Sequence, residues 1–510
     1  MPFIIGISAA AAAYHLVRSH RKKRSSVEDG SGSRKRIKFD KSLLKGLTSV
    51  DLLPMEKGML TLENPIQTIS FYDGNSSDAA RLLWSRLSEV VKANPWLSGW
   101  LVSDDSMNYD PEYDDENDLR LWYNESGSSF HPGLFQYFPV GLIPISRDTP
   151  YTNYEESMEE FHVAVKPNGE IINNVSESIF RVSVIPEHCE SGDLKGFALV
   201  VSMSHVVGDG YTYYKIYNML LGAPVMALDP RRNSNFVPDV EKLMGVQEAN
   251  YAKHMTTDPS WEKFFWWGDH ADDDTKVHGR LFEISDDWLN NYKSAKLARE
   301  RRMNRKPLHT NEFRSYGSDL IIYNEENDIV KCISTNDIIT SWFWNIFQPS
   351  VGMMAINLRG RVDSATDSLA GNYHNSIAYT LSDYSSPDLI QRSLNKCRRA
   401  GVDFDPPTIL PRARLSTSFS VVTNWTSFHK SSSESEQAGV KDLFRGSFTL
   451  VRHMPLFYPL RLREVLPQRT SFLVVFSSSP KKMGCFLIAP SDAISKIESC
   501  GIMNEVFSRF

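Results

Sequence analysis

Segments with strand-like apolar patterns alternate with helical patterns in both halves of this chain, and this alternation limits the fold more than any other feature. In the first half, residues 78–102 begin with a helical pattern that Pro95 ends, and a short apolar strand follows. In the second half, residues 334–347 have apolar side chains at helical spacing after a serine or threonine N-cap. Because 510 residues are many for one core, we expect an α/β or α+β protein with two lobes, each a mixed sheet with flanking helices.

Further strands are predicted from short apolar runs on both sides of a basic segment. They cover residues 169–175, 179–185, 195–204, 351–358, 375–381, 416–425, 471–479 and 483–489. Residues 278–306 begin as a strand and become a helix near Asp286, and their basic end predicts a crossover between lobes. The expected division is an N-terminal segment with a linker at 1–42, a first lobe at 43–298, a crossover at 299–318 and a second lobe at 319–510.

The N-terminus combines an apolar run with a basic flank. Residues 3–17 are uncharged, and `RSHRKKR` follows them. At 1.5 Å per residue this run covers roughly 22 Å of helix, less than the hydrocarbon core of about 30 Å. A membrane signal-anchor, a targeting leader and a tail without a role all stay open. We expect membrane association with the lobes in the cytosol, because the basic flank follows the apolar run; a cytoplasmic or organelle-targeted protein is the alternative.

Residues 18–41 contain many lysines and arginines among serines and glycines, which predicts a disordered basic linker. The whole chain has a formal net charge of −6, so its overall charge does not indicate a nucleic-acid partner. Its five cysteines are spread singly, which argues against a disulfide framework and a structural zinc site and suits a reducing compartment. We therefore predict no metal site.

His205 ends an apolar strand and precedes a helical pattern, within the sequence `SHVVGDG`. Histidine can both accept and donate a proton near neutral pH. Gly208 and Gly210 permit tight turns, and Asp209 either folds back inside the loop or pairs elsewhere. Two other interpretations compete. One is a hydrogen-bonded histidine at a strand end, and the other is a dinucleotide-binding turn, in which Tyr213 would fill the third glycine position.

The stretch resembles the HxxxDG motif of the coenzyme-A-dependent acyltransferase superfamily. This superfamily includes the BAHD acyltransferases, the chloramphenicol acetyltransferases, the wax ester synthases and the condensation domains of peptide synthetases. Ser204 replaces the first histidine of the HHxxxDG form, which favours BAHD-like enzymes over the last two groups.

Other stretches are similar to the family in the same order, over roughly residues 45–505. The segment `INLRGRVD…GNYHNSIAY` resembles a BAHD motif, with Asn357 where the family usually has aspartate. Its matching positions are Arg359, Arg361, Gly371 and Asn375. `TNWTSF` resembles a family strand, and `KDLFRGS` stands where BAHD enzymes carry DFGWG, with matches only at Asp442 and Gly446.

The resemblance implies two chloramphenicol-acetyltransferase-like lobes with the active site at their interface. His205 would take the proton of an acceptor as it attacks the thioester of acyl-CoA, without an acyl-enzyme. Asp209 would be structural and pair with Arg359. Structural support is also expected from other positions, namely Gly208, Gly210, Asn375, Asp442 and Gly446. Acyl-CoA would be a co-substrate, and no further cofactor is implied.

The tetrahedral oxyanion of such a reaction needs hydrogen-bond donors, and `TNWT` offers three. Strand alternation places Asn424 and Thr426 on one face and Trp425 on the other. We favour Asn424 and Thr426 as the donors, and core packing as the role of Trp425.

The predicted function is therefore an acyl-CoA-dependent O- or N-acyltransferase that acts as a monomer on a small alcohol or amine. The apolar N-terminal segment favours a lipophilic acceptor. A catalytically degenerate member that binds a small molecule, and a wax-ester or condensation-type acyltransferase, are the alternatives.

Overall fold

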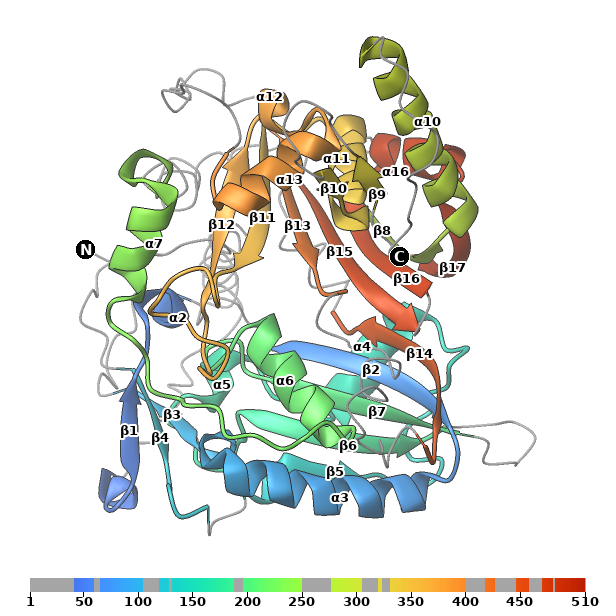
Figure 1. The fold of residues 1–510 in the computed structure, drawn as a ribbon. Coiled ribbons are helices and arrows are strands. Elements are labelled where there is room, and N and C mark those ends of the chain that lie inside the picture. Colours follow the sequence, from blue (N-terminus) through green and yellow to red (C-terminus); the bar gives the residue numbers. More distant parts are fainter. Residues whose placement is uncertain are drawn as a thin grey trace, which may run out of the picture.

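The computed structural model shows two large β-sheets, one in the upper and one in the lower part of the view, each with helices beside it (Figure 1). It describes residues 41–58, 65–103, 119–127, 131–187, 196–249, 277–304, 320–322, 331–399, 418–426, 446–457, 470–479 and 482–509. The mixed α/β architecture with two lobes agrees with the predicted fold class. The apolar residues 3–17 and Asp442 lie outside the described residues, and no described helix is both long and apolar enough to cross a membrane.

The first lobe contains a five-stranded sheet in the order β14-β2-β7-β6-β5. Its strands are β14 (Thr449–Pro455), β2 (Ile66–Asp73), β7 (Gly196–Met203), β6 (Phe180–Pro186) and β5 (Phe135–Tyr137). All neighbours are antiparallel except β5 and β6. A small sheet beside it has the order β1-β4-β3 and consists of β1 (Thr48–Asp51), β4 (Arg120–Tyr123) and β3 (Trp100–Val102).

The second lobe contains a seven-stranded mixed sheet in the order β12-β11-β13-β15-β16-β8-β17. Its strands are β12 (His374–Tyr379), β11 (Val351–Asn357), β13 (Phe419–Asn424), β15 (Thr470–Ser479), β16 (Lys482–Pro490), β8 (Val277–Ile284) and β17 (Met503–Arg509). A two-stranded sheet pairs β10 (Lys331–Ile333) with β9 (Leu320–Ile322). Strand β13 lies between β11 and β15 and is parallel to both.

The helices follow the apolar patterns of the sequence. The longer ones are α3 (Ser76–Ala93), α4 (Tyr151–Glu160), α6 (Gly210–Leu220), α7 (Phe236–Met244), α10 (Asp286–Asn304), α11 (Thr335–Phe347), α13 (Pro387–Lys396) and α16 (Ser491–Ser499). The short ones are α2 (Pro54–Gly58), α5 (Asn168–Ile171) and α12 (Leu381–Tyr384), with 3₁₀ turns η1 (Lys41–Leu44), η3 (Pro95–Ser98) and η4 (Pro132–Leu134). Helix α11 begins with the predicted N-cap, Ser334, whose hydroxyl accepts from the Asp337 backbone N–H in a capping box.

The two sheets exchange strands. Strand β8 precedes the predicted crossover at 299–318 but lies in the seven-stranded sheet, and β14 comes from the second half of the chain but lies in the five-stranded sheet. Each of these two sheets therefore contains strands from both halves of the chain. The physical reason is edge pairing, because β2 and β16 each gain a partner from the other half of the chain.

One strand prediction was wrong. Residues 169–175 form the short helix α5 and turns instead of a strand. Pro167 precedes the helix, and Asn173 has a φ of 57°. Asparagine tolerates this left-handed conformation, which a β-strand does not use. The conformational preferences of Pro167 and Asn173 therefore decided the local structure, and not the two isoleucines that suggested a strand.

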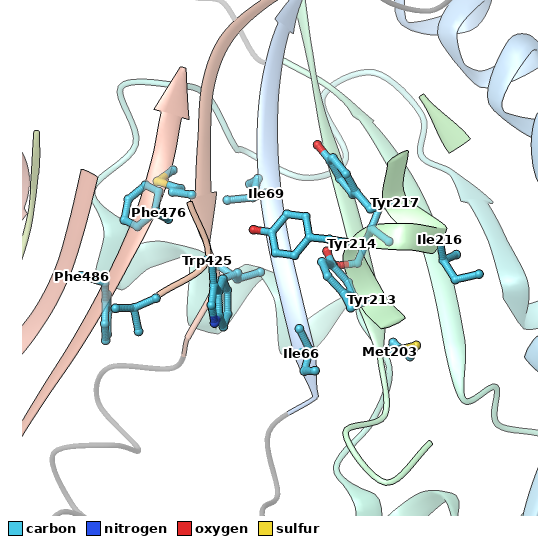
Figure 2. Packing of buried hydrophobic residues seen from close by; sticks show 14 of the residues in the cluster. Ile66, Ile69, Met203, Tyr213, Tyr214, Ile216, Tyr217, Trp425, Phe476 and Phe486 are labelled. Atoms are coloured by element: carbon cyan, nitrogen blue, oxygen red, sulfur yellow. The ribbon is translucent and has the colours of Figure 1, made fainter. Parts of the chain in front are cut away.

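Helix α6 is fixed on the five-stranded sheet by three buried tyrosines (Figure 2). Their rings pack in the core, and their hydroxyl groups find partners in the sheet. The Tyr213 hydroxyl lies 2.7 Å from Thr68 Oγ1, and the Tyr214 hydroxyl lies 3.0 Å from His453 Nε2. The Tyr217 hydroxyl lies 2.7 Å from Ser70 Oγ. Since buried polar groups that are all paired help to specify one packing arrangement, the position of the first turn of α6 is well defined.

Candidate active site

His205 lies in the turn between β7 and α6. All eight residues of β7 are buried, as expected for a central strand, and the strand ends at Met203. The chain turns over residues 204–209 before α6 begins at Gly210. This turn meets the segment before β12, because the Asp209 backbone N–H donates to the Gly371 carbonyl at 3.2 Å. His205 therefore projects from a strand end where the two halves of the chain meet.

Asn372 fixes the tautomer of His205. The Asn372 Nδ2 group donates to the His205 carbonyl at 2.9 Å and to Glu56 Oε1 at 3.2 Å. Its Oδ1 atom is thereby turned toward His205 Nδ1, at 3.1 Å. Because a side-chain amide oxygen can only accept, Nδ1 must carry the proton. Nε2 of neutral His205 then has the free lone pair that a general base needs.

Asn372 is in turn held by a buried ion pair. The side chain of Glu56, in α2, is fully buried, and its Oε1 accepts the Asn372 backbone N–H at 2.8 Å. Arg232 Nε lies 2.8 Å from Glu56 Oε2, and Arg232 Nη2 donates to the Val207 carbonyl at 3.0 Å. The orientation of the His205 ring therefore depends on a chain of charge-assisted contacts from three distant segments.

His205 is held in its neutral form. Burial lowers the pKa of the imidazole, and the charge of Asp209 opposes this effect without cancelling it. A neutral imidazole at neutral pH is able to accept a proton. The electrostatic setting thus suits a base rather than an acid.

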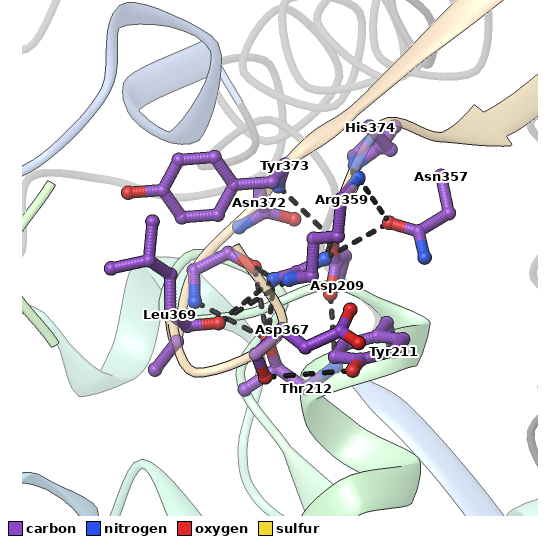
Figure 3. A network of polar contacts seen from close by, with 12 residues as sticks. Asp209, Tyr211, Thr212, Asn357, Arg359, Asp367, Leu369, Asn372, Tyr373 and His374 are labelled. Atoms are coloured by element: carbon purple, nitrogen blue, oxygen red, sulfur yellow. Dashed lines mark hydrogen bonds and ion pairs between the residues drawn. The ribbon is translucent and has the colours of Figure 1, made fainter. Parts of the chain in front are cut away.

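The predicted ion pair between Asp209 and Arg359 is present (Figure 3). Arg359 Nη1 lies 2.6 Å from Asp209 Oδ2, and both side chains are buried. Asp209 also caps α6, because its Oδ1 accepts the Thr212 backbone N–H at 2.9 Å. Burial raises the pKa of the Asp209 carboxyl, but the Arg359 charge and the hydrogen bonds lower it more, so the net shift is downward. Asp209 therefore stays ionised, and this does not suit a group that carries protons in a reaction.

Arg359 joins the turn to the segment before β12. Its Nη2 donates to Thr212 Oγ1 at 3.0 Å and to the Gly371 carbonyl at 2.8 Å. The guanidinium group lies 4.5 Å from the ring centroid of Tyr211 and 5.1 Å from that of Tyr373. These distances are typical of cation–π contacts. The arginine thus connects α6 of one half of the chain with β11 and β12 of the other.

Two glycines are required by close contacts around these groups. A Cβ at Gly208 would lie 2.9 Å from Thr212 Cγ2. A Cβ at Gly371 would lie 3.0 Å from Arg232 Nε, and the φ of +128° is itself unfavourable for other residues. Gly208 therefore serves close packing rather than an unusual backbone conformation.

The `TNWT` segment ends β13. Trp425 is buried against Tyr214 and Phe457, with ring centroids 6.1 and 5.8 Å apart, so it packs in the core as expected (Figure 2). Asn424 and Thr426 are partly buried and contact each other. The Thr426 hydroxyl donates to Asn424 Oδ1 at 2.7 Å, and the Thr426 backbone N–H donates to the same oxygen at 2.8 Å. The hydroxyl proton of Thr426 is therefore already used within this turn.

Two of the remaining predicted support residues, Asn375 and Gly446, have no contact with His205, Asp209 or Arg359 among the described contacts. Asn375 is buried in β12, where its Nδ2 group lies 2.8 Å from Met244 Sδ. Gly446 is exposed in the turn before β14. Gly210 is the first residue of α6.

Sequence reasoning missed several residues of the cluster. They are Glu56, Arg232, Asn372 and His374. Asn372 and His374 lie inside the `GNYHN` segment that resembles the family motif, so the sequence could have indicated that they lie near the site. Glu56 and Arg232 had none, because only the folded chain brings α2 and residue 232 to the loop.

Comparisons with known proteins agree with this fold. No protein-family model matches the chain, and no curated protein matches it. The solved structure of F. graminearum TRI101 complexed with ethyl coenzyme A is similar, with a TM-score of 0.51, 12% identity, and coverage of 89% of this chain and 97% of that chain. Vinorine synthase has a TM-score of 0.47 at 12% identity, with coverage of 94% and 96%. The condensation domain of the Monacolin K polyketide synthase MokA has a TM-score of 0.47 at 11% identity, with coverage of 89% and 95%. The likeness to F. graminearum TRI101 shows that this chain has the same overall fold as that protein.

Proposed function

We propose that this protein is an enzyme that transfers an acyl group from acyl-CoA to the hydroxyl or amine of a small acceptor. The observation that carries the proposal is the contact between His205 Nδ1 and Asn372 Oδ1, which leaves Nε2 as a free base at the meeting point of the two halves. A histidine that merely ended a strand would not need such a fixed tautomer. The coenzyme A analogue bound to F. graminearum TRI101, whose fold covers most of this chain, supports acyl-CoA as the co-substrate.

In the proposed reaction, the acceptor oxygen or nitrogen attacks the thioester carbonyl carbon. His205 Nε2 takes the acceptor proton as the new C–O or C–N bond forms. The tetrahedral intermediate then collapses, the C–S bond breaks, and the imidazolium returns the proton to the leaving thiolate. General-base assistance of this kind contributes about 10²–10⁴-fold. Both substrates meet in one site, so an acyl-enzyme is not needed.

Asp209, Arg359 and Asn372 act through His205 and not on the substrates. Asp209 and Arg359 join the turn to the opposite half of the chain, and Asn372 holds the ring. Asn424 is retained as a candidate oxyanion donor through its Nδ2 group. Thr426 is a weaker candidate than expected, because its hydroxyl proton is donated to Asn424.

The test is release of free CoA from a panel of acyl-CoAs, with extracted metabolites as acceptors and the purified full chain as the enzyme. We expect the His205→Ala variant to release CoA at least about 10²-fold more slowly than wild type. His162→Asn is a suitable control, because His162 is exposed and has a φ of 50°, which asparagine tolerates. If wild type consumes no acyl-CoA with any acceptor but still binds CoA, the chain is a binding module.

The expected lipophilic acceptor and membrane association rest on residues 3–17 alone. A fusion of residues 1–45 to a fluorescent protein tests the second of these. A diffuse cytosolic signal would remove the membrane argument, and with it the reason for preferring a lipophilic acceptor.

A further inference from the structure

His374 is a buried histidine beside His205 whose ring has no partner. It is the first residue of β12, opposite Asn357 at the end of β11. The residue is 7% exposed. Among the described residues, neither Nδ1 nor Nε2 of His374 has a hydrogen-bond partner. Most buried polar groups are paired, so an unpaired ring at this position calls for an explanation.

The surrounding residues do not supply the missing partner. Asp209 Oδ2 lies 4.0 Å from His374 Nδ1, which is too long for a hydrogen bond. That carboxylate oxygen is already used by Arg359 Nη1 and by the Tyr373 backbone N–H. Leaving a buried polar group unpaired lowers stability. A structural role therefore does not account for a histidine here.

His374 lies within substrate reach of His205. The two ring centroids are 6.2 Å apart, and the ring planes are inclined by 53°. A group hydrogen-bonded to His205 therefore has its neighbouring atoms close to the His374 ring. In the proposed reaction, the atom beside His205 is the attacking acceptor atom, and the former carbonyl oxygen is bonded to the same carbon.

The ring is neutral, which suits a donor that does not titrate. Burial lowers the pKa of His374 to about 4, and the nearby charges of Arg359 and protonated His205 act in the same direction, whereas Asp209 opposes them. A neutral imidazole carries one N–H, and no described residue accepts it. Neutral imidazoles polarise carbonyl groups in other enzymes.

We propose that His374 is a catalytic residue of this site, whose ring N–H donates a hydrogen bond to the acyl carbonyl oxygen as negative charge develops on it. The inference rests on the acyl transfer proposed above. His374 would also replace Thr426 as a hydrogen-bond donor to the oxyanion, because the Thr426 hydroxyl donates to Asn424 instead. No proton is transferred by His374, so the proton balance of the reaction is unchanged.

The test compares His374→Leu, which removes the donor, with His374→Gln, which keeps one. We expect His374→Leu to lower kcat for CoA release about 10²–10³-fold, with the KM values of both substrates changed less than about threefold. His374→Gln should recover at least about tenfold of that loss. The melting temperature of His374→Leu should equal or exceed that of wild type, because an apolar side chain replaces an unpaired polar one.

The outcomes separate the two proposals. A wild-type protein that never releases CoA rejects acyl transfer, and the role of His374 with it. An active wild type with an equally active His374→Leu variant rejects only the role of His374. A raised KM for acyl-CoA at unchanged kcat would make His374 a ground-state binding residue and would also overturn the inference. The exposed His162→Asn variant controls for loss of a histidine elsewhere.

Discussion

Asp209 Oδ2 accepts a hydrogen bond of 2.6 Å from Arg359 Nη1, and this buried ion pair joins residues that are 150 positions apart in the chain. Asp209 precedes α6, and Arg359 follows β11. The pair lies beside His205 without contacting its ring nitrogens. The same carboxylate both caps a helix and fixes the relative position of two halves of the chain.

Asp209→Asn should therefore destabilise the protein rather than change the chemistry directly. The substitution leaves the Arg359 charge buried without its partner, and breaking a buried pair in this way costs about 3–5 kcal/mol. Urea unfolding followed by fluorescence measures the change. Asp492→Asn is the matched control, because it removes one charge from an exposed pair with Lys496 and should cost less than about 0.5 kcal/mol. Equal stability of Asp209→Asn and wild type would contradict the structural role.

Asn372→Leu should lower kcat on the order of 10²-fold, because the acceptor that holds the Nδ1 proton of His205 is lost. KM should change little, since the proposed role of Asn372 is to hold the His205 ring. Steady-state rates of CoA release measure both constants. A variant with the wild-type kcat would show that the ring keeps its tautomer without Asn372.

The activity should fall as the pH falls below the ordinary range of histidine. Burial lowers the pKa of His205 from its usual value of 6.5, and only the neutral ring can act as the base. A profile of kcat/KM against pH should therefore be flat near pH 7 and should decline with a midpoint below 6.5. A midpoint above 6.5 in the free enzyme would be incompatible with a lowered pKa of His205.

Acid stability should depend on His374. Its pKa is about 4 in the folded chain and 6.5 in its ordinary state, so between these values the unfolded chain binds more protons, and stability falls as the pH falls. The difference between a pKa of 6.5 and one of about 4 corresponds to roughly 3 kcal/mol of stability, which is fully lost only below pH 4. The charged or titratable groups beside the ring are Asp209, Arg359 and His205. His374→Leu should thus lose less stability than wild type between pH 7 and pH 5 when both are unfolded in urea.

Gly371→Ala should disturb both stability and activity. The added Cβ would lie 3.0 Å from Arg232 Nε and 3.1 Å from Glu56 Oε1, the pair that holds Asn372. Gly360→Ala is the matched control, because Gly360 also has a positive φ but would bring its Cβ within 4 Å of nothing. We expect backbone strain to lower the stability of the control by about 1 kcal/mol. Gly371→Ala should lower the melting temperature more than the control does, and it should also lower kcat. Similar losses for both variants would show that the contacts around Gly371 are adaptable.

Much of the secondary structure follows from sequence patterns because burial on one face imposes a period. Helix α3 was predicted from its apolar face, and the observed helix ends at Ala93, just before Pro95. Strand β7 was predicted from a continuous apolar run, which a central strand buried on both faces requires. Strand β2 was not predicted, because its sequence `IQTISFYD` mixes buried polar and apolar residues. Its Thr68 and Ser70 are buried because they meet tyrosine hydroxyls of α6, and a single sequence does not show such partners.

The sequence by itself determined the elements around `SHVVGDG` and, through motif resemblance, predicted the ion pair between Asp209 and Arg359. These features are local or carry a recognisable spacing. Only the tertiary structure decided which strands each sheet contains, because edge strands pair by position in space and not by order in the chain. It also decided that Glu56 and Asn372 lie in a chain of contacts that ends at the His205 ring, and that His374 lies beside this ring. These contacts join residues that are 167 to 316 positions apart in the chain. No periodic pattern in the sequence indicates which residues so far apart will meet.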